Sequence, residues 1–386
     1  MQVGGAHRPG SGQERAMLQE FRVDNFKSLI NITFRPQATN LLLGMNNSGK
    51  TSLCQALRFL SMSSSLSLDL CADGCGGRFG LKSFMLDKST IDFFVRAAVG
   101  YGDEDLVFEY ELTVSPPGNR YDGEASVRLD REVLSVTGGE FDRTVLLENV
   151  SGRTRLRDER HAEGAPRHVE TTAPTDATML QRLYDADASP RADLFRRYLS
   201  GWTYYDLSPA MMRGSSHKPR ERLIASEGGN LASVLYWLKT RHERAYRKLL
   251  RVVQAIEPSL DLINFNTGSE DHVFMYFEDR NEHWWSAASA SNGTLRFLAL
   301  AYVLLVQPGI GPSPLYMIEE PENGIHVGFL KTLFEMVDDS AARPQLVFTS
   351  HAPYFIDLFD EHLSGVFVLN RGKGHTSITQ PSVDEV

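Results

Sequence analysis

The sequence predicts an α/β fold with a parallel sheet, and three features support that prediction. Residues 38–44 form a short apolar run that ends in glycine, and a helical pattern follows Thr51, as expected of a buried strand that leads into a helix. Between residues 91 and 150, strand-like alternation without helices predicts a meander of β-hairpins. The last part of the chain alternates between helices, expected at 294–306, 324–338 and 353–360, and strands, expected at 314–318, 345–349 and 364–369. Such alternation is typical of parallel strands that are joined by helices.

Composition and charge exclude several classes of protein. The 386 residues are 42% hydrophobic and 23% charged, which excludes a fibrous or wholly disordered chain and leaves ample material for a core. The net charge of −9 excludes a globally basic nucleic-acid coat protein. Three cysteines are too few for a disulfide framework, and no apolar stretch reaches the ~18 residues of a membrane span. We therefore expect a cytoplasmic protein that has no membrane partner.

The pattern divides the chain into four regions. Residues 1–16 lack the apolar segment of a signal peptide and predict a disordered leader. Residues 17–150 are expected to hold the N-terminal part of the α/β domain with its meander, and residues 257–386 the C-terminal part. Residues 151–256 lie between them. They are expected to begin with a polar surface loop at 151–178 and to continue as a helical insertion, in which 230–256 predicts one long helix.

The segment Gly44–Thr51 matches the pattern G-x-x-x-x-G-K-[ST] of a phosphate-binding P-loop. It lies between the apolar strand and the helix, which is the context that such a loop requires. Glycines let backbone N–H groups surround a phosphate at a helix N-terminus. Lys50 would bridge the β- and γ-phosphates, and the Thr51 hydroxyl would bind Mg²⁺. The alternative is an ordinary glycine-rich turn, which the flanking strand and helix disfavour.

Two further strand ends carry polar residues that can act on phosphates. An apolar strand runs into Glu319 and Glu320, where one carboxylate can hold Mg²⁺ and the next can polarise an attacking water. The alternative is a solvated acidic loop. The strand at 345–349 is followed by Ser350 and His351, and an imidazole there can reach a γ-phosphate or the catalytic water. A lone histidine is more often structural, but the neighbouring motifs favour the functional interpretation.

A fourth segment, Ser291–Thr294, opens a long apolar helix. The backbone N–H groups at a helix N-terminus make it a second candidate anion site. A helix cap without any ligand explains the same residues equally well, so both interpretations stay open.

The order of these four motifs, with a long insertion after the P-loop, resembles the head of ABC-type ATPases. Within that class the chain resembles the SMC/RecF/OLD-like group of bacterial AAA-family ATPases, and especially the standalone ATPases of anti-phage defence systems such as Septu and PARIS. The resemblance covers about residues 17–370. It is carried by FRVDNFKSL (21–29), YYDLSPAMMR (204–213), EGGNLASVL (227–235), EEPENGIH (319–326) and TSHAPYFID (349–357).

This resemblance implies an ABC-type ATPase head with a β-meander lobe and a helical insertion in place of a coiled coil. It implies ATP and Mg²⁺ as cofactors, with the metal ion held by Thr51 and Glu319. Catalytic roles are implied for Lys50, for Glu320 as the residue that activates water, and for His351 as the switch histidine. The residues implied for the phosphate loop are Gly44, Asn46, Asn47, Ser48, Gly49, Lys50, Thr51 and Ser52.

The resemblance also implies partners. ATP would lie between two heads of a head-to-tail homodimer or of a higher even assembly, with Ser291 and Gly293 contacting the γ-phosphate bound to the other subunit. The chain ends soon after the strand at 345–349 that precedes the switch histidine, and it leaves no room for the TOPRIM nuclease of OLD-type proteins. An effector such as a nuclease is therefore expected to be a separate chain.

Three departures from the group's pattern bear on hydrolysis. In the segment Ser291–Thr294, which is the signature of the group, Asn292 stands where Asp is common. Glu319 stands where many members have Asp. Residues 56–120 contain no glutamine, so the usual Q-loop metal ligand is not assigned. These departures allow a nucleotide-gated scaffold with little turnover as an alternative to a hydrolysing ATPase. A RecF-like DNA repair ATPase is a further alternative.

The helical insertion is basic although the chain as a whole is acidic. Between Tyr205 and Arg251, ten Lys and Arg residues face four acids, a local charge of +6. This excess favours contact with the phosphate backbone of DNA or RNA. A solvated helix face, or a docking site for an acidic partner protein, explains it equally well.

Overall fold

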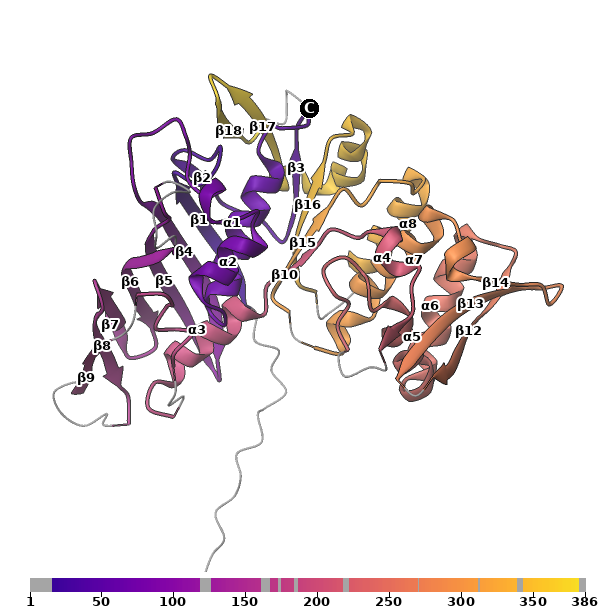
Figure 1. Cartoon of the computed structure of the whole chain (residues 1–386), viewed down its shortest axis with the longest axis horizontal. Coiled ribbons are helices and arrows are strands. Elements are labelled where there is room, and N and C mark those ends of the chain that lie inside the picture. The colour runs from indigo at the N-terminus through magenta and orange to yellow at the C-terminus, as the bar shows by residue number, and fades with distance from the viewer. Residues whose placement is uncertain are drawn as a thin grey trace, which may run out of the picture. The chain divides into compact units, whose positions relative to one another are not determined.

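The computed structural model describes residues 16–118, 126–160, 167–172, 175–183, 187–217, 222–269, 271–311, 313–338 and 343–381 (Figure 1). The leader predicted at 1–16 lies outside these ranges except for its last residue. The chain forms two compact units. The first holds the described residues up to Asn25 together with Thr33–Arg35 and Met62–Ser200. The second holds Phe26–Ile32, Pro36–Ser61 and the chain from Gly201 onward.

The first unit is built on an eight-stranded sheet with the order β2-β1-β4-β5-β6-β7-β8-β9. From β1 to β9 every neighbouring pair is antiparallel, so the predicted meander is confirmed. Along β4 and β5, buried and partly exposed residues alternate, because one face of the sheet lies on a core. The strands are β1 (Met17–Asp24), β2 (Ile32–Phe34), β4 (Ile91–Tyr101), β5 (Glu104–Ser115), β6 (Arg128–Gly138), β7 (Phe141–Val150), β8 (Arg153–Asp158) and β9 (Arg167–Thr172).

The polar loop predicted at 151–178 is wrong in part, because it contains β8 and β9. These strands form an antiparallel hairpin that extends the sheet by two strands. In β8 the buried positions are Thr154 and Asp158, while Arg153 and Arg155 are exposed. The period of two is therefore present, but polar residues occupy both faces and hide it from a hydrophobicity pattern.

Two helices and one 3-10 turn complete the first unit. They are α2 (Leu68–Gly74), α3 (Pro190–Ser200) and η1 (Arg78–Gly80), and the last two residues of α1 (Lys50–Ser63) also belong to this unit. Helix α3 lies against the meander, where the Phe195 ring packs 5.2 Å from the ring of Phe108 and 5.4 Å from that of Tyr110.

The second unit is built on a six-stranded sheet with the order β10-β15-β16-β3-β17-β18. All neighbours from β10 to β17 are parallel, and β18 is antiparallel to β17, so the predicted parallel sheet is confirmed. The strands are β3 (Thr39–Leu43), β10 (Thr203–Tyr205), β15 (Leu315–Glu319), β16 (Gln345–Ser350), β17 (Val366–Gly372) and β18 (His375–Thr379).

A smaller antiparallel sheet lies alongside helices α5 and α6 in the second unit (Figure 1). Its strands are β11 (Ser216–His217), β12 (Leu260–Ser269), β13 (His272–Asp279) and β14 (Trp284–Ser286). The α-helices are α1 up to Ser61, α4 (Pro209–Met212), α5 (Leu231–Arg241), α6 (Glu243–Ile256), α7 (Asn292–Leu305) and α8 (Val327–Asp338). The 3-10 segments are η2 (Ala287–Ser289), η3 (Gln307–Gly309) and η4 (Pro353–Gly365).

The single helix predicted over 230–256 is wrong, because the chain breaks it at His242 into α5 and α6. The backbone of His242 has φ −138° and ψ 57°, outside the helical region. Its N–H still closes the last turn of α5 on the carbonyl of Leu238 (2.8 Å), and its ring lies 4.7 Å from the Trp237 ring in a tilted arrangement. No proline or glycine marks this break, so the helical periodicity continues through it in the sequence.

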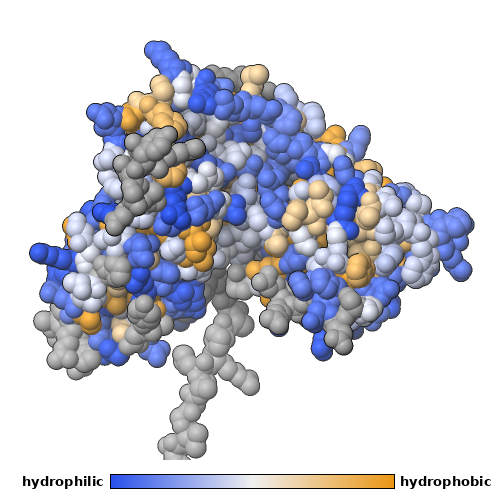
Figure 2. Space-filling model, viewed as in Figure 1, coloured by the Kyte–Doolittle hydropathy of each residue, from blue (hydrophilic) through white to orange (hydrophobic). Residues whose placement is uncertain are grey.

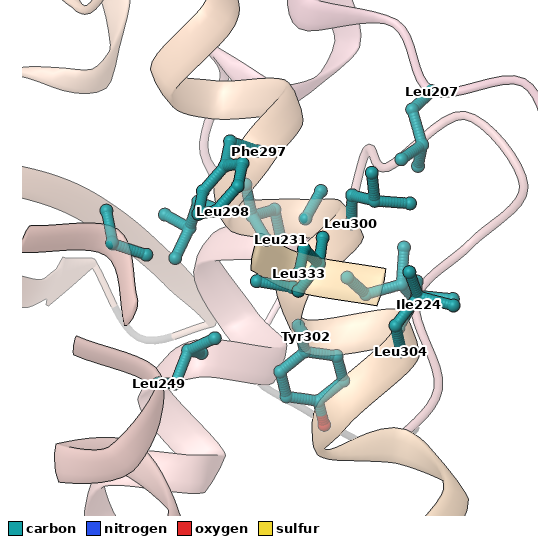
Figure 3. Close-up of a cluster of buried hydrophobic side chains, with 14 of the residues drawn as sticks. Leu207, Ile224, Leu231, Leu249, Phe297, Leu298, Leu300, Tyr302, Leu304 and Leu333 are labelled. Atoms are coloured by element: carbon teal, nitrogen blue, oxygen red, sulfur yellow. The ribbon is translucent and has the colours of Figure 1, made fainter. Parts of the chain in front are cut away.

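The core of the second unit surrounds α7, whose side chains are buried from Thr294 to Leu304 except at Arg296 (Figure 3). A helix that is apolar on all sides must be enclosed, and here it is enclosed by α5, α6, α8 and the large sheet. The residues labelled in Figure 3 are Leu207, Ile224, Leu231, Leu249, Phe297, Leu298, Leu300, Tyr302, Leu304 and Leu333.

In the described part of the chain, no helix has the length and hydropathy that crossing a membrane requires. On the face drawn in Figure 2, hydrophobic residues occur in small patches among hydrophilic ones.

A buried carboxylate joins a middle strand of the first unit's meander to the segment that follows β9. Glu132 on β6 has no solvent exposure. It accepts hydrogen bonds from the Tyr110 hydroxyl (3.0 Å) and from the backbone N–H groups of Met179 (2.6 Å) and Leu180 (3.2 Å). These three donors partly offset the cost of burying the carboxylate.

The Glu132 carboxylate gives the first unit a pH-dependent stability. Burial raises the pKa of Glu132 from 4.5 to about 7, although its three hydrogen bonds oppose the rise. The folded state therefore holds the proton more tightly than the unfolded state, so this stabilisation is complete below pH 4.5 and is lost as the pH rises through 7. We expect it to lower the free energy of unfolding by about 3 kcal/mol between pH ~4.5 and pH ~8.

Urea unfolding at both pH values tests this expectation in the Glu132→Gln variant, whose amide does not titrate. The variant should lose that part of the pH dependence. Glu170→Gln, which changes an exposed carboxylate on β9, is the matched control and should keep the parent's dependence. Equal pH dependence in Glu132→Gln and the parent would contradict the prediction.

Candidate nucleotide site

Three neighbouring parallel strands of the second unit end at one edge of the sheet. Strand β16 lies between β15 and β3, and its register pairs Thr349 with Glu319 and Ser350 with Leu43. The P-loop follows β3, the two glutamates follow β15, and His351 follows β16. The carboxyl edge of a parallel sheet is where such folds bind ligands, and this register brings three predicted motifs to that edge.

The backbone of the phosphate loop is held in place by the hairpin of β17 and β18. Gly49 has φ +108°, and a Cβ there would lie 2.1 Å from the Thr376 hydroxyl oxygen. That hydroxyl donates to the carbonyl of Ser48 (2.9 Å), and Arg371 donates to the Asn47 side chain (2.5 Å). Asn47 itself has φ +67°, in the left-handed region that asparagine tolerates. The loop therefore has one shape, which a glycine and the C-terminal hairpin both enforce.

Lys50 begins α1 and turns back over the loop. Its side chain is 5% exposed, and Nζ donates to the carbonyl oxygens of Gly44 (2.6 Å) and Met45 (3.0 Å). Burial lowers the pKa of Lys50, while the negative charges of Glu320, Glu319 and Glu322 oppose that shift. The ammonium is bound only to neutral carbonyl oxygens in the described residues, so a phosphate would give it a stronger partner.

A threonine and a glutamate form the part of the site suited to a cation. The Thr51 hydroxyl donates to Oε2 of Glu319 (2.9 Å). Within the described residues, Oε1 of Glu319 is buried without a hydrogen-bond partner. Burial raises the pKa of Glu319, and the charge of Asp206, at the end of β10, adds to the rise. A divalent cation would satisfy the orphaned oxygen and remove this electrostatic penalty, so these oxygens fit the hard ligands of Mg²⁺.

The second glutamate forms a polar network with the histidine. Glu320 has φ +43°, an unfavourable conformation for a residue with a side chain. Its Oε1 lies 3.3 Å from Nδ1 of His351, and its Oε2 accepts from the amide of Asn323 (2.6 Å). Glu322 is 5% exposed, and its Oε1 accepts a hydrogen bond from the Ser350 hydroxyl. The same oxygen lies 3.9 Å from Nδ1 of His351. Burial raises the pKa of Glu322.

The signature segment caps α7. Ser291 is the N-cap, and its hydroxyl oxygen accepts from the N–H of Thr294 (3.0 Å). Gly293 packs against the backbone after the glutamates, since a Cβ there would lie 2.3 Å from the carbonyl oxygen of Gly324. Arg296 then donates to the carbonyl of Asn323 (2.8 Å). The start of α7 and the loop that carries Glu320 are thus in direct contact.

The structure brings together at the sheet edge the predicted residues Gly44, Asn46, Asn47, Ser48, Gly49, Lys50, Thr51, Ser52, Glu319, Glu320 and His351. It places Ser291 and Gly293 at the start of α7. In the described part of the chain, neither residue is hydrogen-bonded to the phosphate loop.

Residues that sequence reasoning missed include Asp206 and Asn323. Asp206 follows β10, which neighbours β15, so it ends the strand next to the one that carries Glu319. The segment YYDLSP contained this signal, a short aromatic strand followed by an acid, but the three-residue strand is too short for a periodicity argument. In the described residues no group of three or more His, Cys, Asp or Glu could hold a metal ion, so any metal ion here depends also on the Thr51 hydroxyl and on ligand oxygens.

Comparison with known proteins gives the family and the fold. Residues 40–357 match the family described as AAA domain, putative AbiEii toxin, Type IV TA system. Among curated proteins, none matches the sequence. Three similar solved structures are SMC head domains, and they are 11–12% identical to this chain.

One of these, an Smc head bound to the C-winged helix domain of ScpA, covers 95% of this chain and 98% of its own, with a TM-score of 0.54 at 12% identity. The Smc head from Pyrococcus furiosus, bound to the C-terminal domain of ScpA, is 12% identical to this chain. Their alignment covers 96% of this chain and 97% of that head, with a TM-score of 0.49. The SMC head from Thermotoga maritima is 11% identical, and its alignment covers 95% of this chain and 99% of that head, with a TM-score of 0.42. The first likeness shows that this chain has the fold of an Smc head domain, which agrees with the predicted α/β class.

The contact between Gly49 and Thr376 predicts a stability change. Gly49→Ala would force alanine into φ +108°, at about 1 kcal/mol, and would press its Cβ on a buried side chain. We expect the two effects together to lower the free energy of unfolding by about 3 kcal/mol, measured by urea unfolding.

The double variant Gly49→Ala/Thr376→Ala separates the backbone cost from the cost of the contact with Thr376. Compared with Thr376→Ala alone, it should retain only the backbone cost of about 1 kcal/mol. Gly372→Ala is the control, because a Cβ there meets nothing within 4 Å. A full loss in the double variant would show that the contact with Thr376 is not the cause.

Proposed function

This chain belongs to the family described as AAA domain, putative AbiEii toxin, Type IV TA system, and from that premise we propose that it binds and hydrolyses ATP as a head-to-tail dimer. The observation that carries the proposal is the meeting of Lys50, the Thr51–Glu319 pair and the Glu320–His351 pair at one sheet edge. These are the groups that phosphoryl transfer to water needs: a phosphate cradle, a cation site and a residue that orients the water.

Each group has a distinct task in this proposal. The N–H groups of the loop and the Lys50 ammonium hold the phosphates, and Thr51 and Glu319 hold Mg²⁺, which supplies charge neutralisation when bound. Asp206 is close enough to act on the charge of Glu319 and is a candidate for a further oxygen ligand, directly or through water. Glu320 accepts a proton from the water while Asn323 and His351 orient its carboxylate.

The dimer is proposed because, within the described residues, the signature makes no hydrogen bond to the phosphate loop of its own chain. Ser291 is exposed at the start of α7, and in that part of the chain its hydroxyl contacts only Thr294, as a local cap. A γ-phosphate bound to a second copy would meet both this hydroxyl and the N-terminal N–H groups of α7. Two such sites related by a twofold axis form a closed, isologous pair.

Replacing the proposed base tests hydrolysis and assembly together. Glu320→Gln keeps the shape of the side chain but cannot accept the proton, so steady-state turnover should fall by about a hundredfold or more. ATP would remain bound, and light scattering should show a stable dimer with ATP and Mg²⁺. Lys50→Ala, which removes the phosphate contact, should show neither turnover nor the ATP-dependent dimer.

The outcomes separate the two candidate functions. If Glu320→Gln turns over ATP at the parent's rate, Glu320 is not the base. If the parent assembles with ATP but shows no Lys50-dependent turnover, the chain is a nucleotide-gated scaffold. Asn292 and Glu319, which depart from the group's pattern, are the residues that favour this second candidate.

A polyanion is the second partner that we propose, and α6 carries the support for it. Arg244, Lys248 and Arg251 are exposed and recur at helical spacing, with Arg241 and Arg247 beside them. The single acid of α6, Glu243, pairs with Arg247 (2.5 Å). The insertion's Lys218, Arg220 and Glu221 lie outside the described residues. A row of cations with one counter-charge suits the phosphates of DNA or RNA.

The salt dependence of binding tests this surface. Arg244→Glu/Lys248→Glu/Arg251→Glu should weaken binding to DNA or RNA duplexes, and the slope of log Kd against log salt should fall by about 2–3. Charge reversal at Arg153, Arg280 and Lys331, which are also exposed, is the matched control and should leave that slope unchanged. Equal slopes in both triple variants would exclude α6 as the nucleic-acid surface, and binding of an acidic protein would replace it.

The biological role that we propose is the gating of a response in anti-phage defence. Closure of the ATP-bound dimer would act on a separately encoded effector, such as a nuclease. A RecF-like role in DNA repair is the alternative. Gene neighbours discriminate between the two, because an adjacent nuclease or toxin reading frame favours defence.

A further inference from the structure

One arginine organises the loop that leads into the signature. Arg213 follows α4, and its Nη1 donates to the carbonyl oxygens of Ala287 (3.1 Å), Ala288 (2.6 Å) and Ala290 (2.8 Å). Its Nη2 donates to Oδ1 of Asn292 (2.6 Å). A single side chain therefore gathers four acceptors from a loop of six residues.

These contacts fix where α7 begins. Ser291 lies between two of the four acceptors, and its backbone has the extended conformation of an N-cap (φ −66°, ψ 151°). The next glycine, Gly293, cannot shift toward the loop after the glutamates, because it already packs on Gly324. Arg213 on one side and Gly324 on the other thus set the direction of the Ser291 hydroxyl and of the first N–H groups of α7.

The chemistry of the contact calls for arginine. Nη1 carries two N–H groups, so two of its three acceptors share one hydrogen, while Nη2 reaches the fourth acceptor. A lysine ammonium has a single nitrogen and cannot occupy both positions of this fork. All four acceptors are neutral, and among the described residues no carboxylate lies within ion-pair distance of Arg213. The fork is therefore used to hold a backbone shape, and its charge is not cancelled by a neighbouring acid.

From this geometry we propose that Arg213 is the positioning residue of the signature, which holds Ser291 and Gly293 in the shape that receives the γ-phosphate bound to a second copy. This inference rests on the proposed dimeric ATPase. The side chain of Asn292 is part of the same device, since its carbonyl oxygen is the fourth acceptor. Asn292 is thus a partner of Arg213 through its side-chain oxygen, a contact that an Asp at this position would also make.

The position of Arg213 in the chain gives the device a second consequence. Arg213 lies seven residues beyond Asp206, on the segment that leaves β10 beside Glu319. The same short segment therefore touches the cation side of one ATP site and the signature that serves the other. Closure of the dimer on one nucleotide can therefore shift both Asp206 and Arg213, the two ends of this segment.

Mixing two inactive variants tests whether Arg213 acts on the other subunit's nucleotide. Arg213→Gln should lower turnover by about tenfold or more, and it should leave the ATP affinity of the single chain within about twofold of the parent's. In an equimolar mixture with Lys50→Ala, at most half of the dimers hold one chain of each kind, and each of these is closed by the one ATP that its Lys50-bearing chain binds. Such a dimer has one site with an intact Lys50 and an intact Arg213 from opposite chains, so up to about a quarter of the parent's activity should return.

A second mixture separates failure of this inference from failure of the proposed function. Ser291→Arg mixed with Lys50→Ala must regain activity if the dimer is head to tail. If that pair complements and the Arg213→Gln pair does not, Arg213 acts within its own chain and the inference is overturned. If neither pair complements although the parent hydrolyses ATP and light scattering shows dimers in both mixtures, the head-to-tail dimer itself is wrong.

Two further variants separate positioning from charge. Arg213→Lys keeps the charge and loses the fork, so it should be nearly as impaired as Arg213→Gln. Asn292→Ala combined with Arg213→Gln should be no worse than Arg213→Gln alone, because both remove the same contact. Parent-like activity of Arg213→Lys, or additive losses in the double variant, would contradict the positioning role.

Discussion

The parallel register of β3, β16 and β15 is the constraint on which the site depends. Because three neighbouring strands run in one direction, the three loops that follow them leave at the same edge. Glycine at position 49 and the hairpin that bears Thr376 then fix the first loop, and the left-handed backbone of Glu320 directs the second. The sheet brings the three loops close together, and a few strained or crowded backbone positions set the direction in which the loops point.

The edge also concentrates charge in a poorly solvated place. Lys50 is buried beside three carboxylates, two of which have raised pKa values because of burial. Within the described residues, the ammonium is bound to carbonyl oxygens, and Oε1 of Glu319 has no hydrogen-bond partner. Buried groups with such imperfect partners cost stability, so the arrangement is explained by ligands that complete it. Phosphates and a divalent cation are the pair whose charges complement it.

Sequence alone predicted the parallel sheet, the meander and the residues of the three strand-end loops, because those rest on local patterns: apolar runs, a glycine-lysine loop and acids after a strand. It failed at β8 and β9, where polar residues fill both faces, and at His242, where a helix breaks without proline or glycine. It also missed Asp206, Arg213 and Asn323. Their roles depend on which strands are neighbours and which loops touch, and neither property is local in the sequence.

Those missed residues share a feature that links the two halves of the proposed mechanism. The start of α7 is tied to the rest of the unit by two arginines: Arg213, from the segment that leaves β10, and Arg296, which binds the carbonyl of Asn323. Asn323 in turn holds the carboxylate of Glu320. If binding of a phosphate displaced the signature, the position of the Glu320 carboxylate in the same chain would therefore change. The bonds from Arg296 to Asn323 and from Asn323 to Glu320 are short and join half-buried groups, so the path transmits position rather than charge. A dimer built this way would couple the state of one ATP site to the chemistry of the other.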